Sequence, residues 1–232
     1  MNHRIIISLG GSIMSPRPGY LDINFLKKFR QIVLKHIVAK KRQAIIVTGG
    51  GQLNKQYNQA VKKVIQPKPI ELDRLGIAAT RFHAELIRII FGEFAHPEVL
   101  INPTRRIKAK QPIICACGWK PGCSTDKDAV LLASTFGCSE IINLTNIDFV
   151  YTKDPRKFPE AKRVLETTWS KYLKMIPSRW SPRLNTPFDP IASRLAQKNR
   201  LNVAIINGRK LGQFIRHLAD QPFRGTLIKR DK

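Results

Sequence analysis

The chain has 232 residues, 43% of them hydrophobic and 25% charged, which is typical of a globular protein with a sizeable core. No apolar run approaches the ~18 residues of a membrane-spanning helix, and the N-terminal stretch is too quickly broken by glycine for a signal peptide, so we expect a cytoplasmic protein. The net charge of +25 points to nucleic acid or another polyanion, but the 41 Lys and Arg residues are dispersed, which equally fits the host's general composition or a surface that attracts nucleotides.

The four cysteines lack the spacing of a metal site. Three of them, Cys115, Cys117 and Cys123, are close together without a C-x₂-C pair, and the five histidines are scattered. We therefore expect reduced, partly buried thiols and no resident metal site.

The N-terminal part predicts a strand, a helix and a second strand. Residues 4–9 are an apolar run that leads directly into Gly10, Gly11 and Ser12. Apolar residues then recur at helical spacing from residue 21 to about residue 41, and residues 43–48 are the next apolar run. A unit of this kind favours parallel strands and a right-handed crossover.

Three consecutive glycines, Gly49–Gly51, separate that second strand from the next predicted helix. Glycines without a Cβ allow close approach to the backbone, and a helix N-terminus attracts anions, so a phosphate group is one interpretation. A plain tight turn is the other. The spacing matches neither a P-loop nor a G-x-G-x-x-G fingerprint.

Two helices are predicted next, over residues 51–65 and 71–91. The apolar stripe expected on the second one comprises Leu72, Leu75, Ala79, Phe82, Leu86 and Ile90. Another face carries Asp73, Gly76 and Thr80. By spacing alone these three residues are either a binding face or a solvated acid beside a close-packing glycine.

The middle of the chain predicts strands at residues 97–100 and 112–117, followed by a turn-rich segment and a helix over 127–136. Thr125 and Asp128 fit a capping box, so the Thr125 hydroxyl serves either a helix cap or a ligand. The sequence does not separate these two roles.

The C-terminal part begins with a strand over 141–145, and the polar residues 146–155 follow it where α/β sheets bind ligands. Residues 156–188 are basic and proline-rich, and we expect a flexible lid or peripheral excursion there. Asp189 and Pro190 predict the N-cap and first position of a helix. A strand at 202–206, a helix at 211–219 and a closing edge strand at 225–229 complete the prediction.

Six motifs occur in a family-specific order. They are L-G-G-S at 9–12, G-G-G-x-L at 49–53, L-D-x-x-G-I-x-x-T-R at 72–81, P-G-x-S-T-D at 121–126, T-N-x-D-x-V-Y-T-x-D-P at 145–155 and D-P-I-A-x-x-L-A at 189–196. With them the chain resembles the amino acid kinase family, and most closely the UMP kinases of archaeal type.

This resemblance implies an α/β fold, a three-layer αβα sandwich with a mainly parallel central sheet. It also implies one domain over residues 1–232, with the acceptor UMP bound by about 1–137 and ATP by about 138–232. The implied activity is ATP-dependent phosphorylation of UMP to UDP in pyrimidine nucleotide biosynthesis, with ATP and Mg²⁺ as cofactors. The family tends to form hexamers, so a homo-oligomer is implied.

The resemblance also assigns roles to residues. For catalysis it implies Asp189, Lys55 and Ser12. For UMP it implies Gly50, Asp73, Thr80, Trp119, Lys120, Pro121, Gly122, Cys123, Ser124 and Thr125. For ATP it implies Gly10, Gly11, Gly51, Lys55, Thr145, Asn146, Tyr151 and Asp154.

Three positions depart from the family pattern. Ser8 stands where many relatives have a lysine, so Lys55 or Lys120 would have to replace that cation. Phe149 stands where a glycine is usual, and Trp119-Lys120 replaces a smaller pair. Two alternatives are therefore a kinase acting on another small phosphorylated or carboxylated acceptor, and a non-catalytic protein that binds polyanions or nucleic acid. Kinases of isopentenyl phosphate or fosfomycin are disfavoured, because residues 52–57 contain no histidine.

Overall fold

The computed structural model describes residues 4–178 and 186–231. The elements of the first half are β1 (Arg4–Leu9), α1 (Gly11–Met14), α2 (Ile23–Val33), the π-helical turn η1 (Leu34–Val38), β2 (Gln43–Thr48), α3 (Gly51–Val64), α4 (Pro69–Phe91), the short 3₁₀ helix η2 (Gly92–Phe94), β3 (Ile113–Ala116) and α5 (Thr125–Phe136). Those of the second half are β4 (Glu140–Thr145), β5 (Val150–Tyr151), β6 (Arg163–Val164), β7 (Glu166–Thr168), α6 (Trp169–Met175), α7 (Pro190–Lys198), β8 (Asn202–Asn207), α8 (Leu211–Leu218) and β9 (Gly225–Lys229).

A seven-stranded sheet in the order β3-β2-β1-β4-β8-β9-β7 forms the middle layer. Its first five strands are parallel, while β9 is antiparallel to β8 and parallel to β7. Because these five strands end at one edge, the loops that follow them meet there. The predicted sandwich around a mainly parallel sheet is confirmed.

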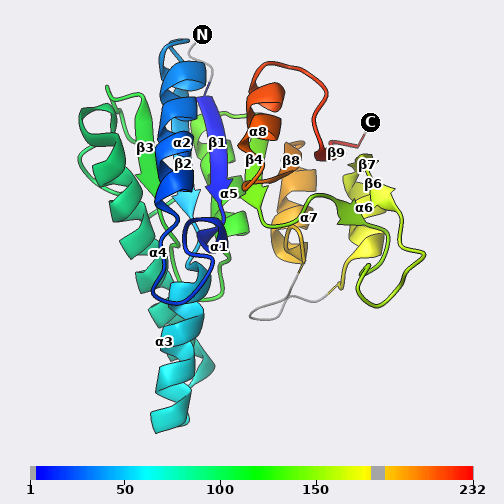
Figure 1. The fold of residues 1–232 in the computed structure, drawn as a ribbon, viewed down its shortest axis with the longest axis horizontal. Coiled ribbons are helices and arrows are strands. Elements are labelled where there is room, and N and C mark those ends of the chain that lie inside the picture. Colours follow the sequence, from blue (N-terminus) through cyan, green and yellow to red (C-terminus); the bar gives the residue numbers. More distant parts are fainter. Residues whose placement is uncertain (1–3, 179–185, 232) are drawn as a thin grey trace.

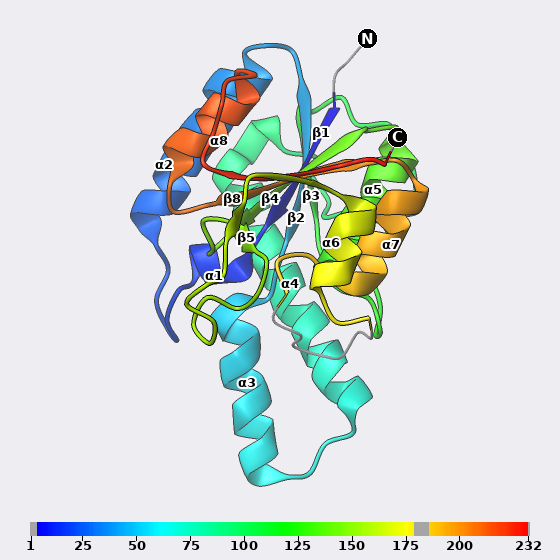
Figure 2. The same cartoon turned by 90° about the vertical axis from the view of Figure 1, so that its right-hand side faces the viewer.

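Helices cover both faces of the sheet (Figure 2). On one face, aromatic residues of α2, α4 and α8 pack together, with Phe29 contacting Phe91 and Phe214. On the other face α5, α6 and α7 bury Trp169 and Tyr172. Within the described ranges, no helix is long and apolar enough to span a membrane.

Helix α3 and the N-terminal half of α4 extend beyond the sheet as a hairpin (Figures 1 and 2). The apolar stripe predicted on α4 is therefore wrong in part: of its six residues only Ala79 is buried, and the other buried residues of the helix are Thr80, His83, Ala84, Ile87 and Phe91. Phe82 is 66% exposed. Only the C-terminal half of α4 has a sheet to pack against, so one helical face cannot remain buried along its whole length.

Residues 156–188 do not form the peripheral excursion that their prolines suggest. Among the residues described there, β7 extends the sheet and Trp169 and Tyr172 are fully buried. The Trp169 Nε1 donates to the Leu201 carbonyl at 2.7 Å, and the Tyr172 hydroxyl donates to that of Phe188 at 2.9 Å. Residues 179–185 of the expected lid lie outside the described residues.

Two strand predictions also need correction. Strand β9 is not at the edge, because β7 pairs with its free side. Residues 97–100 form no continuous strand and contribute only an isolated bridge between Leu100 and Ala116. In addition, α5 begins at Thr125, two residues earlier than predicted, and its N-cap is Ser124, whose hydroxyl accepts the Lys127 N–H at 3.1 Å. The capping box at Thr125 is therefore absent.

Candidate active site

The two glycine turns predicted from the sequence meet at the carboxyl edge of the sheet. A Cβ on Gly11 would overlap the backbone of Gly49, and one on Gly51 would overlap the backbone of Gly11. Gly51 also has φ of +56°, which favours glycine. The turns after β1 and β2 therefore touch backbone to backbone, which no other residue type would permit.

Helix α3 starts from this contact with an open N-terminus. Its N-cap is Gly50, and no side chain caps the helix. The first-turn N–H groups and the positive end of the helix dipole are thus available to an anion. The geometry is consistent with the phosphate interpretation of the triple glycine.

A cavity of about 520 Å³ opens beside these groups, between α3, α4 and the start of α5. We call it the acceptor cavity. Its lining comprises Gly50, Asn54, Asn58, Lys62, Pro67, Pro69, Leu72, Asp73, Gly76, Ile77, Thr80, Gly118, Cys123, Ser124, Thr125, Asp126, Thr186 and Asp189.

Two α4 residues that were predicted to bind the acceptor form hydrogen bonds to the segment between β3 and α5, on the other side of the cavity. The Asp73 Oδ2 accepts the Gly122 N–H at 3.0 Å. The Thr80 hydroxyl accepts the Gly118 N–H at 2.8 Å. Asp73, Gly76 and Thr80 therefore share one side of α4, as their spacing indicated, and of the two alternatives this side is the one that faces a cavity.

Several predicted residues line neither this cavity nor the donor cavity described below. They are Gly10, Gly11, Ser12, Gly51, Lys55, Trp119, Lys120, Pro121 and Gly122. Lys55 is on the exposed side of α3, and the Lys120 Nζ lies 3.9 Å from the centre of the Trp119 ring. Neither lysine is thus directed into a cavity to replace the one missing at Ser8.

Asp189 is the N-cap of α7, as predicted, and is 5% exposed. Its Oδ1 accepts the N–H groups of Ile191 at 2.7 Å and Ala192 at 2.9 Å, while its Oδ2 accepts the Ser124 hydroxyl. The Asp189 N–H in turn donates to Asp126 Oδ2 at 3.2 Å. The N-termini of α5 and α7 are thereby joined at the cavity.

Two acids beside Asp189 have raised pKa values. The pKa of Asp126 is raised to about 8, mainly because burial removes water from the carboxyl group and secondly because the Asp189 carboxylate is nearby. Burial is also the main cause that raises the pKa of Asp128 to about 7. The sequence prediction missed Asp126 as a site residue, although it is the last residue of the P-G-x-S-T-D motif.

The second cavity, of about 460 Å³, lies after β4, and we call it the donor cavity. It contains four residues expected to bind ATP, namely Thr145, Asn146, Tyr151 and Asp154. Asp154 pairs with Arg156 at 3.0 Å, and this hydrogen-bonded arginine lowers the pKa of the carboxyl group. The cavity is also bordered by Thr186, which lines the acceptor cavity as well.

Phe149, which replaces the usual glycine, is 4% exposed and does not have a positive φ. The guanidinium groups of Arg163 and Arg224 lie 5.5 and 5.8 Å from the centre of its ring. These distances suit cation–π interactions. The turn therefore accepts the phenylalanine in an ordinary backbone conformation, with two cations beside the ring.

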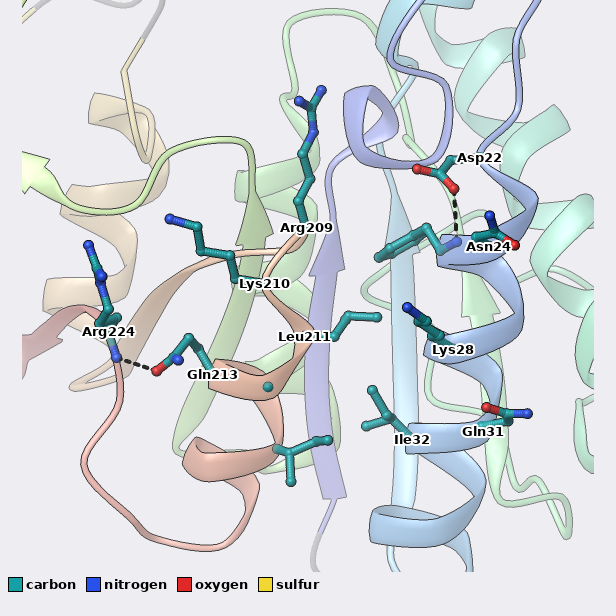
Figure 3. A pocket seen from close by; sticks show the side chains of 13 residues that line it. Asp22, Asn24, Lys28, Gln31, Ile32, Arg209, Lys210, Leu211, Gln213 and Arg224 are labelled. Atoms are coloured by element: carbon teal, nitrogen blue, oxygen red, sulfur yellow. Dashed lines mark hydrogen bonds between the residues drawn. The ribbon is translucent and has the colours of Figure 1, made fainter.

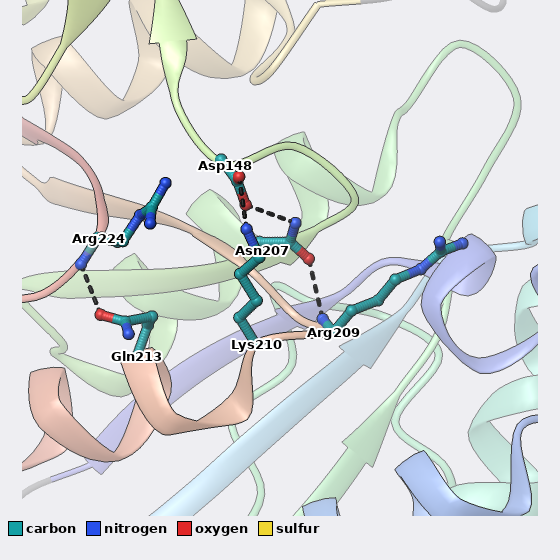
Figure 4. Close-up of polar contacts among 6 residues, drawn as sticks. All are labelled: Asp148, Asn207, Arg209, Lys210, Gln213 and Arg224. Carbon is teal, nitrogen blue, oxygen red and sulfur yellow. Dashed lines mark hydrogen bonds and ion pairs between the residues drawn. The ribbon is translucent and has the colours of Figure 1, made fainter.

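The loop after β4 is tied to the turn after β8 through Asp148 (Figure 4). Asp148 accepts hydrogen bonds from Asn207 Nδ2 at 2.8 Å and Lys210 Nζ at 2.6 Å. These hydrogen bonds lower the pKa of Asp148. Asn207 Oδ1 also accepts the Arg209 N–H at 3.0 Å, which orders the turn that leads into α8.

A third cavity, a groove of about 680 Å³, separates α2 from α8 (Figure 3). Its lining contains four basic residues and one acidic residue, Asp22. The basic residues are Lys28, Arg209, Lys210 and Arg224. Asp22 is already engaged as the N-cap of α2, where it accepts the Phe25 N–H at 2.9 Å. Part of the large net charge is therefore concentrated on this side of the molecule.

The carboxylates at the acceptor cavity fit the Mg²⁺ ion that the family resemblance implies. Among the described residues no group of three or more His, Cys, Asp or Glu could hold a metal by itself. Protein-bound Mg²⁺ usually has one or two carboxylate ligands in addition to substrate phosphates. Asp126 and Asp189 fit that requirement, and their crowding favours a neutralising cation.

Polar residues on α3 were not predicted as part of the site. Asn54, Asn58 and Lys62 recur every fourth residue and all line the acceptor cavity. Their i, i+4 spacing could have indicated a shared face. On a helix with so many polar residues, however, the sequence does not show which face is covered.

The chain matches one protein family over most of its length. The model of the amino acid kinase family matches residues 3–207. The uridylate kinase of Methanospirillum hungatei is 30% identical over 98% of this chain and 95% of its own, and that of Pyrococcus abyssi is 31% identical over 89% and 91%.

Solved structures show the same fold. The uridylate kinase of Archaeoglobus fulgidus superposes with a TM-score of 0.79 at 24% identity, over 97% of this chain and 99% of its own. The aspartate kinase of Synechocystis gives 0.74 at 15% identity, over 98% of this chain and 40% of its own. The sequence match over most of the chain, together with this fold, shows that the chain belongs to the amino acid kinase family.

Proposed function

We propose that the protein transfers the γ-phosphoryl group of ATP to UMP, forming UDP and ADP, in pyrimidine nucleotide biosynthesis. The observation that carries the proposal is the pair of cavities on either side of Thr186. Both have the volume of a typical small-ligand site, which is about 300–1,000 Å³. Relatives named uridylate kinase, about 30% identical over nearly the whole chain, support the assignment.

In this proposal the cavities hold the two nucleotides. UMP occupies the acceptor cavity, with its phosphate at Gly50 and its ribose hydroxyls at Asp73. ATP occupies the donor cavity, with its adenosine near Thr145 and Tyr151. The glycine contact between Gly11 and Gly51 adjoins Gly50, which lines the acceptor cavity, and its bare N–H groups would meet phosphate oxygens.

The residues at the junction suit phosphoryl transfer, which depends mainly on positioning and on stabilising negative charge. The first turn of α3 orients the acceptor phosphate. Asp189 is held rigidly by two backbone N–H groups and organises Ser124 beside the reacting phosphates. A Mg²⁺ ion bound with the nucleotide would supply charge neutralisation, and Asp126 and Asp189 are the carboxylates that would hold it.

Residues other than Lys55 and Lys120 can replace the positive charge of the lysine that many relatives have at position 8. In the described part of the chain, the basic residues bordering the two cavities are Lys62, Lys153 and Arg156. We propose that these residues contribute the positive potential for the nucleotides. The general basic surface would add long-range attraction.

We further propose that the protein acts in the cytoplasm as a homo-oligomer. The α3–α4 hairpin supports self-association, because a shallow hollow there is lined by Leu53, Tyr57, Leu75, Ala78, Ala79 and Phe82. Tyr57 is 54% exposed in the single chain. Exposed apolar residues gathered in one region are typical of a protein contact.

A coupled assay of ADP release tests the main proposal. The enzyme is supplied with ATP and Mg²⁺ and with UMP, CMP, AMP or no acceptor. Release that depends on UMP is the expected result. A folded protein that binds ATP but releases no ADP with any of these nucleotides would require another acceptor, and absence of ATP binding would contradict the kinase proposal.

A further inference from the structure

Asn58 is the only residue of α3 that is buried, although it is an amide on a helix whose other residues are exposed or half-buried. It is 4% exposed and lies on the wall of the acceptor cavity. Asparagine is seldom found inside a protein without a specific partner for its side chain. Its burial beside a substrate cavity therefore calls for an explanation.

The Asn58 side chain is only half satisfied. Its Nδ2 donates to Asn54 Oδ1 at 2.8 Å, but its Oδ1 has no hydrogen-bond partner among the described residues. A buried acceptor without a donor destabilises the folded state, because the oxygen has lost its water. Packing of α3 against α4 would be served better by an apolar residue at position 58.

The opposite wall of the cavity leaves room for this amide pair. A Cβ on Gly76 of α4 would lie 3.1 Å from the Nδ2 and 3.2 Å from the Oδ1 of Asn54. Such distances are shorter than most contacts of a real Cβ atom. Glycine at position 76 thus leaves room for Asn54, which together with Asn58 forms a polar part of the same cavity lining that contains Asp73.

We propose that Asn58 Oδ1 accepts a hydrogen bond from the base of the phosphate acceptor and thereby determines base specificity. This inference rests on the proposed function. In UMP the base has one hydrogen-bond donor, the N3–H group, while the ribose hydroxyls are assigned to Asp73. Asn58 is thus the residue that pairs with the uracil N3–H.

The hydrogen bond between Asn54 and Asn58 supports this direction of pairing. It engages one N–H of the Asn58 amide and leaves the buried Oδ1 without a partner among the described residues. The opposite orientation of both amides would offer an N–H group instead, which suits the unprotonated N3 of CMP. A preference for UMP over CMP would therefore indicate the first amide orientation, and the reverse preference would indicate the second.

The test uses wild-type enzyme with UMP, with UMP methylated at N3 and with CMP. Loss of one neutral hydrogen bond corresponds to about a tenfold change in binding, so we expect KM for N3-methyl-UMP to be about tenfold higher than for UMP. The kcat should change much less. An unchanged KM for N3-methyl-UMP, or a preference for CMP, would overturn the inference without any variant being made.

Two variants sharpen the result. Asn58→Ala should raise KM for UMP about tenfold and should abolish the difference between UMP and N3-methyl-UMP. Gln59→Ala, which removes an exposed amide from the same helix, is the matched control and should behave as wild type. If methylation weakened binding equally in wild type and Asn58→Ala, Asn58 would not contact N3.

A stability measurement excludes a merely structural role. Asn58→Leu replaces the unpaired oxygen with an apolar group, so its Tm should be at or above that of wild type while KM for UMP rises. A fall of more than about 4 °C, equivalent to the loss of a structural interaction in a protein of this size, would contradict the inference. Wild type that neither binds nor phosphorylates UMP would overturn the proposed function itself, and this inference with it.

Discussion

The backbone N–H of Asp189 donates to the carboxylate of Asp126 at 3.2 Å, so that two acids from different helices are held side by side at the acceptor cavity. Burial, and after it the proximity of the Asp189 carboxylate, makes the ionised form of Asp126 unfavourable. The charge of this pair therefore couples the stability of the free protein to pH.

The stability of the nucleotide-free protein should decrease as pH rises from about 4 to about 8. The pKa of Asp126 is 3.8 when unperturbed and about 8 in the folded protein, so the folded state binds the extra proton within this window. Asp128, with a pKa of about 7, acts in the same direction. Asp126→Asn should raise Tm at pH 8 by about 3 °C or more and should flatten the pH profile.

Thermal unfolding measured from pH 5 to pH 9 checks this expectation. Asp154→Asn is the control, because its carboxyl group is exposed and its pKa is lowered by Arg156. A wild-type profile that rises with pH across this range would contradict the prediction.

Asp73→Asn should weaken UMP binding about tenfold or more while the affinity for ATP stays near that of wild type. The substitution removes the charge that would accept the ribose hydroxyls, and hydrogen bonds to charged groups are worth about 1.5–3 kcal/mol. Calorimetric titration with each nucleotide measures the effect. Glu71→Gln, which removes an exposed acid from the same helix, should change neither affinity, and equal loss of both affinities in Asp73→Asn would refute the assigned role.

Asp189→Asn should lower kcat by about 100-fold, the usual effect of removing one electrostatic group from an active site. Both substrates should still bind, because the asparagine oxygen can still cap α7 at Ile191 and Ala192. Single-turnover kinetics together with nucleotide titrations check this. Unchanged turnover would remove Asp189 from the catalytic residues.

Phe149→Ala should destabilise the protein by about 3 kcal/mol, as is usual for truncation of a buried phenylalanine. It should also raise KM for ATP, because Phe149 lines the donor cavity and its ring organises Arg163 and Arg224. Chemical denaturation and steady-state kinetics measure the two effects. Phe158→Ala is the control, because Phe158 is 41% exposed and its truncation should change the free energy of unfolding little.

Phe82→Asp should reduce the molar mass of the protein in solution if the α3–α4 hairpin is a contact between copies. Light scattering coupled to size-exclusion chromatography gives that mass. Ile89→Asp is a matched control on the same helix, because Ile89 is 65% exposed but lies outside the hollow. The same mass for wild type and Phe82→Asp would argue against a contact through this hollow.

Regular patterns in the sequence predicted most of the sheet. The apolar runs at 4–9, 43–48 and 202–206 are strands β1, β2 and β8, and Asp189 with Pro190 starts α7 as expected. These elements were predictable because the residues of each one, an apolar run or an Asp-Pro pair, favour that structure by themselves. Strand β7 was not, since three residues in a proline-rich segment become a strand only when β9 is present to pair with them.

The glycine turn was predictable because its requirement is local: Gly51 has the positive φ that favours glycine. The position of Asp73 at the cavity was implied only by the family resemblance, because its helical spacing equally fits a solvated acid. Asn58 and Asp126 were missed because their significance depends on burial, which arises only from the tertiary arrangement of α3, α4 and α7. The same reason explains why the exposed position of Phe82 was not foreseen.

The backbone contact between Gly11 and Gly51 has a mechanical consequence. Since the turns after β1 and β2 touch without any intervening side chain, neither turn can move closer to the other. In the proposed reaction this contact would fix the spacing of the two nucleotides, and the motion that admits substrates would occur in the segments around it.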